Sequence, residues 1–182
     1  QYKLLNNVVG GVVFLISLVT YLLTIEPTAS FWDCGEFIST AYKLEIGHPP
    51  GAPFFMLMAR FFTLFASDVH EVAKMVNIFS AFMSALTILF LFWTITHLAR
   101  RLVIKNESDF TLGNTIAILG AGTVGALAYT FSDTFWFSAV EAEVYASSSM
   151  FTAIVFWAML KWEDVADRPF ANRWLILIAY LM

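Results

Sequence analysis

Long apolar runs constrain this chain more than any other feature. Residues 8–25 contain no charged side chain, and a helix of that length crosses about 30 Å of hydrocarbon. No small-x-small cleavage site follows this run, which argues against a cleaved signal peptide. We predict an all-α fold, a polytopic transmembrane helix bundle. The predicted spans cover residues 8–25, 75–98, 111–131, 144–162 and 174–182, the last of them incomplete.

The composition supports a membrane protein. Of 182 residues, 59% are hydrophobic and 13% are charged, whereas soluble domains carry about 25% charged residues. The net charge of −4 and the absence of a basic tract argue against a nucleic-acid partner. Because the sequence begins with Gln1 and stops in an apolar run, we expect 1–182 to be a single transmembrane domain and an N-terminal fragment of a longer protein.

The distribution of basic residues predicts the orientation, since lysine and arginine gather in cytoplasmic loops. They lie before the first predicted span, between the second and third, and between the fourth and fifth: Lys3, Arg100, Arg101, Lys105, Lys161, Arg168 and Arg173. The 132–143 loop has none. We therefore predict a cytoplasmic N-terminus, with residues 26–74 and 132–143 as external segments.

The apolar stretch 52–66 is a test of this topology. It is short for a span and carries Arg60 in its middle, so we predict a helix that lies in the membrane interface. A second helix is predicted over residues 31–46. The Pro- and Gly-rich turn 47–51 would join them. The first external loop would then hold two juxtamembrane amphipathic helices.

The 31–46 stretch is the best site candidate because it gathers acidic residues beside a histidine, His48. Helical spacing places one polar stripe on a single face: Asp33, Glu36, Thr40 and Lys43. The opposite face is apolar: Phe37, Ile38, Ala41 and Leu44. The alternative is a surface helix that shows its polar face to water.

The 132–143 loop ends in a second group of acidic residues. Glu141 and Tyr145 would share a face in a helix, whereas Glu141, Glu143 and Tyr145 would share one in an extended segment. Carboxylates this close to hydrocarbon carry a desolvation cost unless they are partnered or line a wet cavity. The alternative is that they sit in headgroup water.

Other patterns have structural explanations. Residues 120–125 match G-x-G-x-x-G, but a dinucleotide site needs a preceding strand, and this match lies inside an apolar span. We interpret its small residues as a helix-packing surface. His70 and His97 are isolated, and the lone Cys34 cannot form an internal disulfide.

Three motifs carry a family resemblance: W-D-C-G-E-F at 32–37, K-L-x-x-G-H-P-P-G-A-P at 43–53, and E-A-E-V-Y at 141–145. The chain resembles the DUF2723 family of bacterial membrane proteins, whose eukaryotic relatives include a protein O-mannosyltransferase. That family is similar to GT-C glycosyltransferases, which take sugars from polyprenyl-phosphate donors on the non-cytoplasmic side. The resemblance implies the N-terminal part of a GT-C-like fold in a bacterial inner membrane, with the site facing the periplasm.

The resemblance also suggests residue roles. In GT-C enzymes an acidic residue just after the first span serves as base or metal ligand, a role that falls to Asp33 or Glu36 here. The cationic candidates for binding the donor phosphate are His48, Arg60 and Lys43. The candidates for orienting the acceptor or bracing the loop are Glu141, Glu143 and Tyr145. Asp33 and Glu36 could share a divalent cation, and the sequence points to no other cofactor.

The expected function is transfer of a sugar, with mannose as one candidate, to a hydroxyl of a protein or glycan. The expected partners are a polyprenyl-phosphate sugar, that acceptor and the lipid bilayer. The alternative is a non-catalytic transporter or complex scaffold. Transporters place ionisable residues at mid-span depth, whereas an enzyme of this kind would gather the acidic residues of both external segments at one site.

Overall fold

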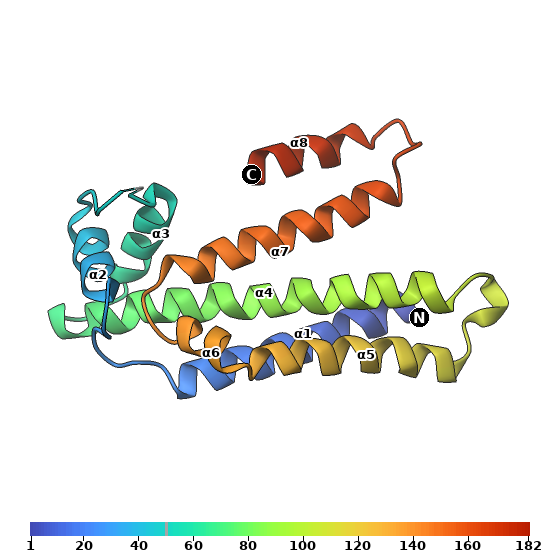
Figure 1. Cartoon of the computed structure of the whole chain (residues 1–182), viewed down its shortest axis with the longest axis horizontal. Helices are drawn as coiled ribbons and strands as arrows, with labels where there is room; N and C mark the ends of the chain where they lie inside the picture. Colours follow the sequence, from blue (N-terminus) through green and yellow to red (C-terminus); the bar gives the residue numbers. More distant parts are fainter. Residues whose placement is uncertain (50) are drawn as a thin grey trace. The chain divides into compact units, whose positions relative to one another are not determined.

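The computed structural model describes residues 1–49 and 51–182, and every regular element in them is a helix (Figure 1). Pro50, in the predicted turn 47–51, lies outside the described residues. In chain order the elements are α1 (Tyr2–Leu23), α2 (Cys34–Lys43), α3 (Pro53–Thr63), η1 (Val69–Glu71), α4 (Val72–Val103), η2 (Glu107–Asp109), α5 (Leu112–Thr130), α6 (Asp133–Ala139), α7 (Val144–Glu163) and α8 (Asn172–Leu181).

Four helices in the described residues are long and apolar enough to cross a membrane. They are α1, the combined η1–α4 helix over Val69–Val103, α5 and α7. The four complete apolar runs in the sequence therefore correspond to four helices of spanning length. α3 has 11 residues, about 16 Å of helix, which is too short to cross a bilayer; its place in the membrane interface stays a prediction. α8 is also short, with 10 residues.

The chain forms two compact units. The first contains residues 1–16, 86–130 and 150–182. Its helices α4 and α5 approach closely where Gly122 faces Phe92 and Thr96, and where Gly125 faces Ile95. A Cβ atom at Gly125 would stand 2.7 Å from the Ile95 Cδ1. Gly122 and Gly125 thus form part of a packing surface, as interpreted from the sequence, whereas Gly120 faces open space.

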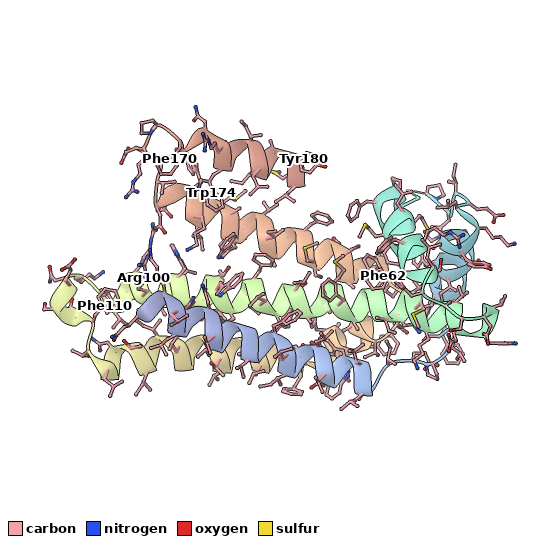
Figure 2. All side chains as sticks on the ribbon, turned by 180° about the vertical axis from the view of Figure 1, so that it is seen from behind. Phe62, Arg100, Phe110, Phe170, Trp174 and Tyr180 are labelled. Carbon is pink, nitrogen blue, oxygen red and sulfur yellow. The ribbon has the colours of Figure 1, made fainter. Side chains whose placement is uncertain are left out.

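The second unit contains residues 17–85 and 131–149. Helices α2 and α3 lie side by side in it (Figure 1). Phe55 of α3 joins Phe37 of α2 to Phe79 of α4, with ring centroids 5.7 Å and 5.4 Å apart. Phe62, labelled in Figure 2, stands 5.2 Å from the same Phe79 ring. This aromatic core holds the α2–α3 pair.

Helix α2 is shorter than the predicted 31–46 helix. Asp33 is its N-cap, and Leu44 ends it in the left-handed conformation, with φ 55°. Phe37, Ile38 and Ala41 are buried as predicted, but the turn at Leu44 leaves that side chain 56% exposed. The prediction that Leu44 lies on the apolar face of this helix was therefore wrong, because the helix ends before it.

The 132–143 segment contains a short helix, α6, that the sequence did not indicate. It is held to the segment that follows α1, because the Trp136 indole donates to the Thr24 hydroxyl over 2.9 Å. The Glu26 amide also donates to the Val140 carbonyl over 3.1 Å. These bonds join two parts of the chain that are more than 100 residues apart, and they bring Glu141 and Glu143 towards α2.

Candidate functional site

The first cluster is the acidic triad of Asp33, Glu36 and His48. The His48 backbone amide donates to Glu36 Oε1 over 2.6 Å, and its Nδ1 lies 3.0 Å from Glu36 Oε2. The His48 Nε2 lies 4.0 Å from Asp33 Oδ2. The imidazole thus stands between the two carboxylates. The Asp33 side chain is 58% exposed, so a substrate can reach it.

The triad exists because the chain turns back sharply after α2. Gly47 allows the close approach, since a Cβ atom there would stand 3.0 Å from Glu36 Oε1. Gly51 takes a φ of +82°, a conformation that glycine adopts without steric cost. Gly47 therefore lets the segment after α2 carry His48 back onto the first turn of that helix, and Gly51 turns the chain after His48.

The Glu36–His48 contact shifts the pKa values of the two side chains in opposite directions. The backbone and side-chain hydrogen bonds from His48 lower the pKa of Glu36. The hydrogen bond to Glu36, and its charge, raise the pKa of His48. The stabilisation from this ion pair is therefore largest between the two ordinary pKa values. It is lost as the pH falls through the lowered pKa of Glu36 or rises through the raised pKa of His48.

The second cluster is the thiol–carboxylate cluster of Cys34, Glu141 and Glu143. The Cys34 thiol donates to Glu143 Oε1 over 3.5 Å. Cys34 is fully buried and Glu141 is 5% exposed, while Glu143 is partly buried. Burial raises the pKa of Cys34 to about 12, and the charges of Glu141 and Glu143 add to the effect. Burial also raises the pKa of Glu143, with Glu141 and Asp33 contributing.

The two clusters are adjacent, because Asp33 and Cys34 are consecutive residues at the start of α2. The negative charge of Asp33 contributes to the raised pKa of Glu143. Acidic residues from both segments, Asp33 from 26–74 and Glu143 from 132–143, are therefore electrostatic neighbours. The sequence singled out both groups, and the enzyme hypothesis expects acidic residues of both segments at one site, but the sequence assigned Cys34 no role.

Four other candidate residues lie elsewhere. Thr40 was predicted on the polar stripe, but it is 8% exposed and donates to the Glu36 carbonyl over 2.7 Å. Lys43 is exposed at the end of α2. Arg60 donates to the Thr63 hydroxyl over 3.1 Å and stands 5.2 Å from the Tyr42 ring centroid. Tyr145 is 65% exposed at the start of α7.

The thiol–carboxylate cluster also contradicts the helical interpretation of Glu141. α7 begins only at Val144, so Glu141 precedes the helix and shares no helical face with Tyr145. The alternative of headgroup water is wrong for Glu141, since that side chain is buried. Each cluster could supply three donor atoms to a metal ion, because the atoms within each lie within 4.8 Å of one another.

We predict that Cys34 resists thiol reagents in the folded protein. The thiol is buried and its pKa is about 12, so the reactive thiolate is scarce at pH 8. Peptide-level mass spectrometry after treatment with iodoacetamide should find Cys34 unmodified before denaturation and fully modified after it. Rapid modification of the folded protein would show that the thiol–carboxylate cluster is open to solvent.

The fold and these clusters define a class of protein. It is a multi-span helical membrane protein with acidic side chains grouped beside the start of a short helix, α2. The chain belongs to the family described as the protein O-mannosyl-transferase TMEM260 N-terminal domain, which matches residues 33–182. This membership confirms the O-mannosyltransferase side of the resemblance. The DUF2723 and GT-C assignments and the bacterial inner membrane stay predictions.

Two curated relatives illustrate the similarity. The protein O-mannosyl-transferase tmem260 of Dictyostelium discoideum is 25% identical over 143 residues, which are 78% of this chain and 15% of that protein. The protein O-mannosyl-transferase TMEM260 of Mus musculus is 28% identical over 152 residues, 84% of this chain and 19% of that protein. The chain thus matches less than a fifth of the length of either relative. No solved structure matches it.

Proposed function

We propose that this chain is the acid-bearing part of a membrane glycosyltransferase. The enzyme transfers a sugar from a polyprenyl-phosphate donor to a hydroxyl of a protein or glycan on the non-cytoplasmic side. The names of the relatives favour mannose as the sugar and a protein as the acceptor. One observation supports the site most strongly: Glu143 of the second segment lies within electrostatic reach of an accessible carboxylate of the first, Asp33.

The proposed step is a displacement at the anomeric carbon of the donor sugar. The acceptor oxygen forms a new bond to that carbon, and the bond from the carbon to the phosphate oxygen breaks. The acceptor proton passes to the Asp33 carboxylate, and the polyprenyl phosphate leaves with the bonding electron pair. A base positioned within hydrogen-bonding reach of the hydroxyl accelerates such a step.

The phosphate that leaves carries negative charge and needs a cationic or hydrogen-bonding partner. His48 is the best placed of the three cationic candidates, since its imidazole lies between Asp33 and Glu36. Glu36 acts through His48 and is a positioning residue. Arg60 is held by Thr63 and Tyr42, and with Lys43 it can contribute to the electrostatic attraction of the donor.

Glu141 and Glu143 have a different proposed role from Asp33. Both are at least partly buried against Cys34, so they support the start of α2 and fix the direction of Asp33. Tyr145 is exposed, and its hydroxyl is free to orient an acceptor group. The base and its supports would then come from the two segments predicted to be external.

A divalent cation fits the acidic triad, because carboxylate oxygens and an imidazole nitrogen suit such ions. Asp33, Glu36 and a neutral His48 would hold it, and the ion, in place of a protonated His48, would neutralise the phosphate. We predict that EDTA stops sugar transfer and that Mn²⁺ or Mg²⁺ restores it if the triad works with an ion. Transfer that is unchanged in EDTA would assign the neutralisation to His48 alone.

The experiment that tests the function is donor turnover by the full-length protein. Polyprenyl-phosphate mannose, and the corresponding glucose and N-acetylglucosamine donors, would be incubated with the protein and an acceptor peptide rich in serine and threonine. Consumption of one donor with formation of a glycopeptide supports the proposal. Binding without consumption of any donor would favour the transporter or scaffold alternative.

A further inference from the structure

The first compact unit contains a cavity of about 590 Å³ that the proposed transfer does not use. It is lined by the first residues of α1, the last turns of α4, and the end of α7 with the segment that follows it. All these residues belong to the same unit. Figure 2 labels Arg100, one of the lining residues, at the end of α4.

The cavity is strongly cationic. Lys3, Arg100, Lys161 and Arg168 line it, and Asp164 is the acidic residue among its lining. The Asp164 carboxylate is already engaged, since Arg101 Nη2 lies 3.1 Å from its Oδ1. The cavity therefore carries an excess of positive charge. The preference of basic residues for one membrane face explains their presence. It does not explain the unpaired polar atoms that are buried beside them.

Three buried polar atoms of residues that line this cavity have no hydrogen-bond partner in the described part of the chain: Asn6 Oδ1, Trp93 Nε1 and His97 Nε2. The residues Asn6, Trp93 and His97 all line the cavity, and His97 is only 4% exposed. Buried polar groups are satisfied in most proteins. The Trp93 Nε1 lies beside Gly10 of α1, and the His97 Nε2 lies 3.7 Å from Asp164 Oδ1. An unpaired N–H beside a cationic cavity suits a ligand oxygen, and the Asn6 Oδ1 suits a ligand hydroxyl.

A second cavity, of about 710 Å³, shares Tyr2, Lys3 and Arg100 with the first. Its lining includes Leu5, Phe110 and Leu112, so an apolar surface continues from the cationic one. This arrangement suits a molecule with an anionic head and an apolar tail. It favours a lipid over a free ion as the source of the anionic group.

We infer that the cavity at Arg100 and Trp93 binds a phosphate group, with the headgroup of an anionic phospholipid as its favoured source. Arg100 and Lys161 neutralise the phosphate. Trp93 donates its indole N–H to a phosphate oxygen, His97 binds a second polar group of the head, and Asn6 Oδ1 accepts from a headgroup hydroxyl. The apolar neighbouring cavity takes part of an acyl chain. This site is separate from Asp33, so its test does not depend on sugar transfer.

The test is native mass spectrometry of the full-length protein, titrated with phosphatidylglycerol and with phosphatidylcholine of the same chains. We expect phosphatidylglycerol to bind at least about tenfold more tightly. The double variant Arg100→Gln/Lys161→Gln should lose that preference, since each basic residue near anionic lipid contributes several-fold. The matched control is Arg173→Gln, an exposed basic residue outside the cavity lining, which should bind as the wild type does.

A second variant keeps the inference testable if the double variant fails to fold. Trp93→Phe keeps an aromatic ring against Phe90 and Trp157 and removes only the unpartnered N–H. It should weaken phosphatidylglycerol binding by about tenfold, the effect of one hydrogen bond to a charged group. Without lipid it should unfold at the same temperature as the wild type, because no protein hydrogen bond is lost.

A separate arm uses inorganic phosphate to identify the source of the group. Saturable binding of inorganic phosphate that Trp93→Phe weakens, with no preference for phosphatidylglycerol, would support the phosphate site and assign it to a soluble ligand. Equal binding of the two lipids together with no binding of inorganic phosphate would overturn the inference. Binding that neither variant changes would overturn it as well.

Discussion

Replacing Asp33 by asparagine is expected to abolish sugar transfer by the full-length protein while leaving expression and membrane insertion intact. Asparagine keeps the size of the side chain but cannot accept the proton of the acceptor hydroxyl. A positioned general base contributes about 10²- to 10⁴-fold to a rate, so turnover should fall by at least about 100-fold. Because Asp33 is 58% exposed and its side chain makes no cap hydrogen bond, the thermal unfolding temperature should change little.

A matched control is available in the same segment. Glu45 is exposed and lies outside both clusters, so Glu45→Gln removes one negative charge without touching the proposed site. This variant should retain wild-type turnover. If Asp33→Asn and Glu45→Gln behave alike and both stay active, Asp33 is not the base.

The second large effect is expected from Gly122→Val, which introduces a side chain where α4 and α5 are in contact. A Cβ atom at Gly122 would stand 3.0 Å from Phe92 Cε2 and would also collide with the Thr96 methyl. Overpacking of this kind costs about 1–3 kcal/mol. We expect a clear fall in the thermal unfolding temperature measured in detergent.

Gly120→Val is the matched control for this prediction. Gly120 lies one half-turn earlier in α5, and a Cβ atom there would meet no other atom within 4 Å. The same substitution should therefore leave the unfolding temperature almost unchanged. Equal unfolding temperatures for the two variants would contradict the close packing of α4 and α5 at Gly122.

The helices of spanning length were predictable because their signal is local. An uninterrupted apolar run such as 8–25 needs only its own composition to indicate a helix. The interior of α2 was predictable for the same reason, since Phe37 and Ala41 recur at helical spacing. Its end was not, because Leu44 adopts a left-handed conformation that no residue-type preference indicates.

Long-range placement could not be predicted. Cys34 and Glu143 are 109 positions apart, and only the tertiary fold brings the thiol to the carboxylate. Thr40 faces Met56 instead of solvent because its hydroxyl is satisfied by the Glu36 carbonyl, a bond that spacing alone does not reveal. His97, isolated in the sequence, gains Asp164 as a neighbour 3.7 Å away.

The most direct test of the central hypothesis is photo-crosslinking of a donor analogue to the full-length protein. A polyprenyl-phosphate mannose that carries a diazirine near the phosphate would be irradiated with the protein in membranes, and adducts would be mapped by mass spectrometry. We predict adducts within residues 31–48, around Asp33 and His48, that the natural donor competes away. Adducts confined to other parts of the protein, or adducts at 31–48 that the natural donor does not reduce, would contradict a donor site at the acidic triad.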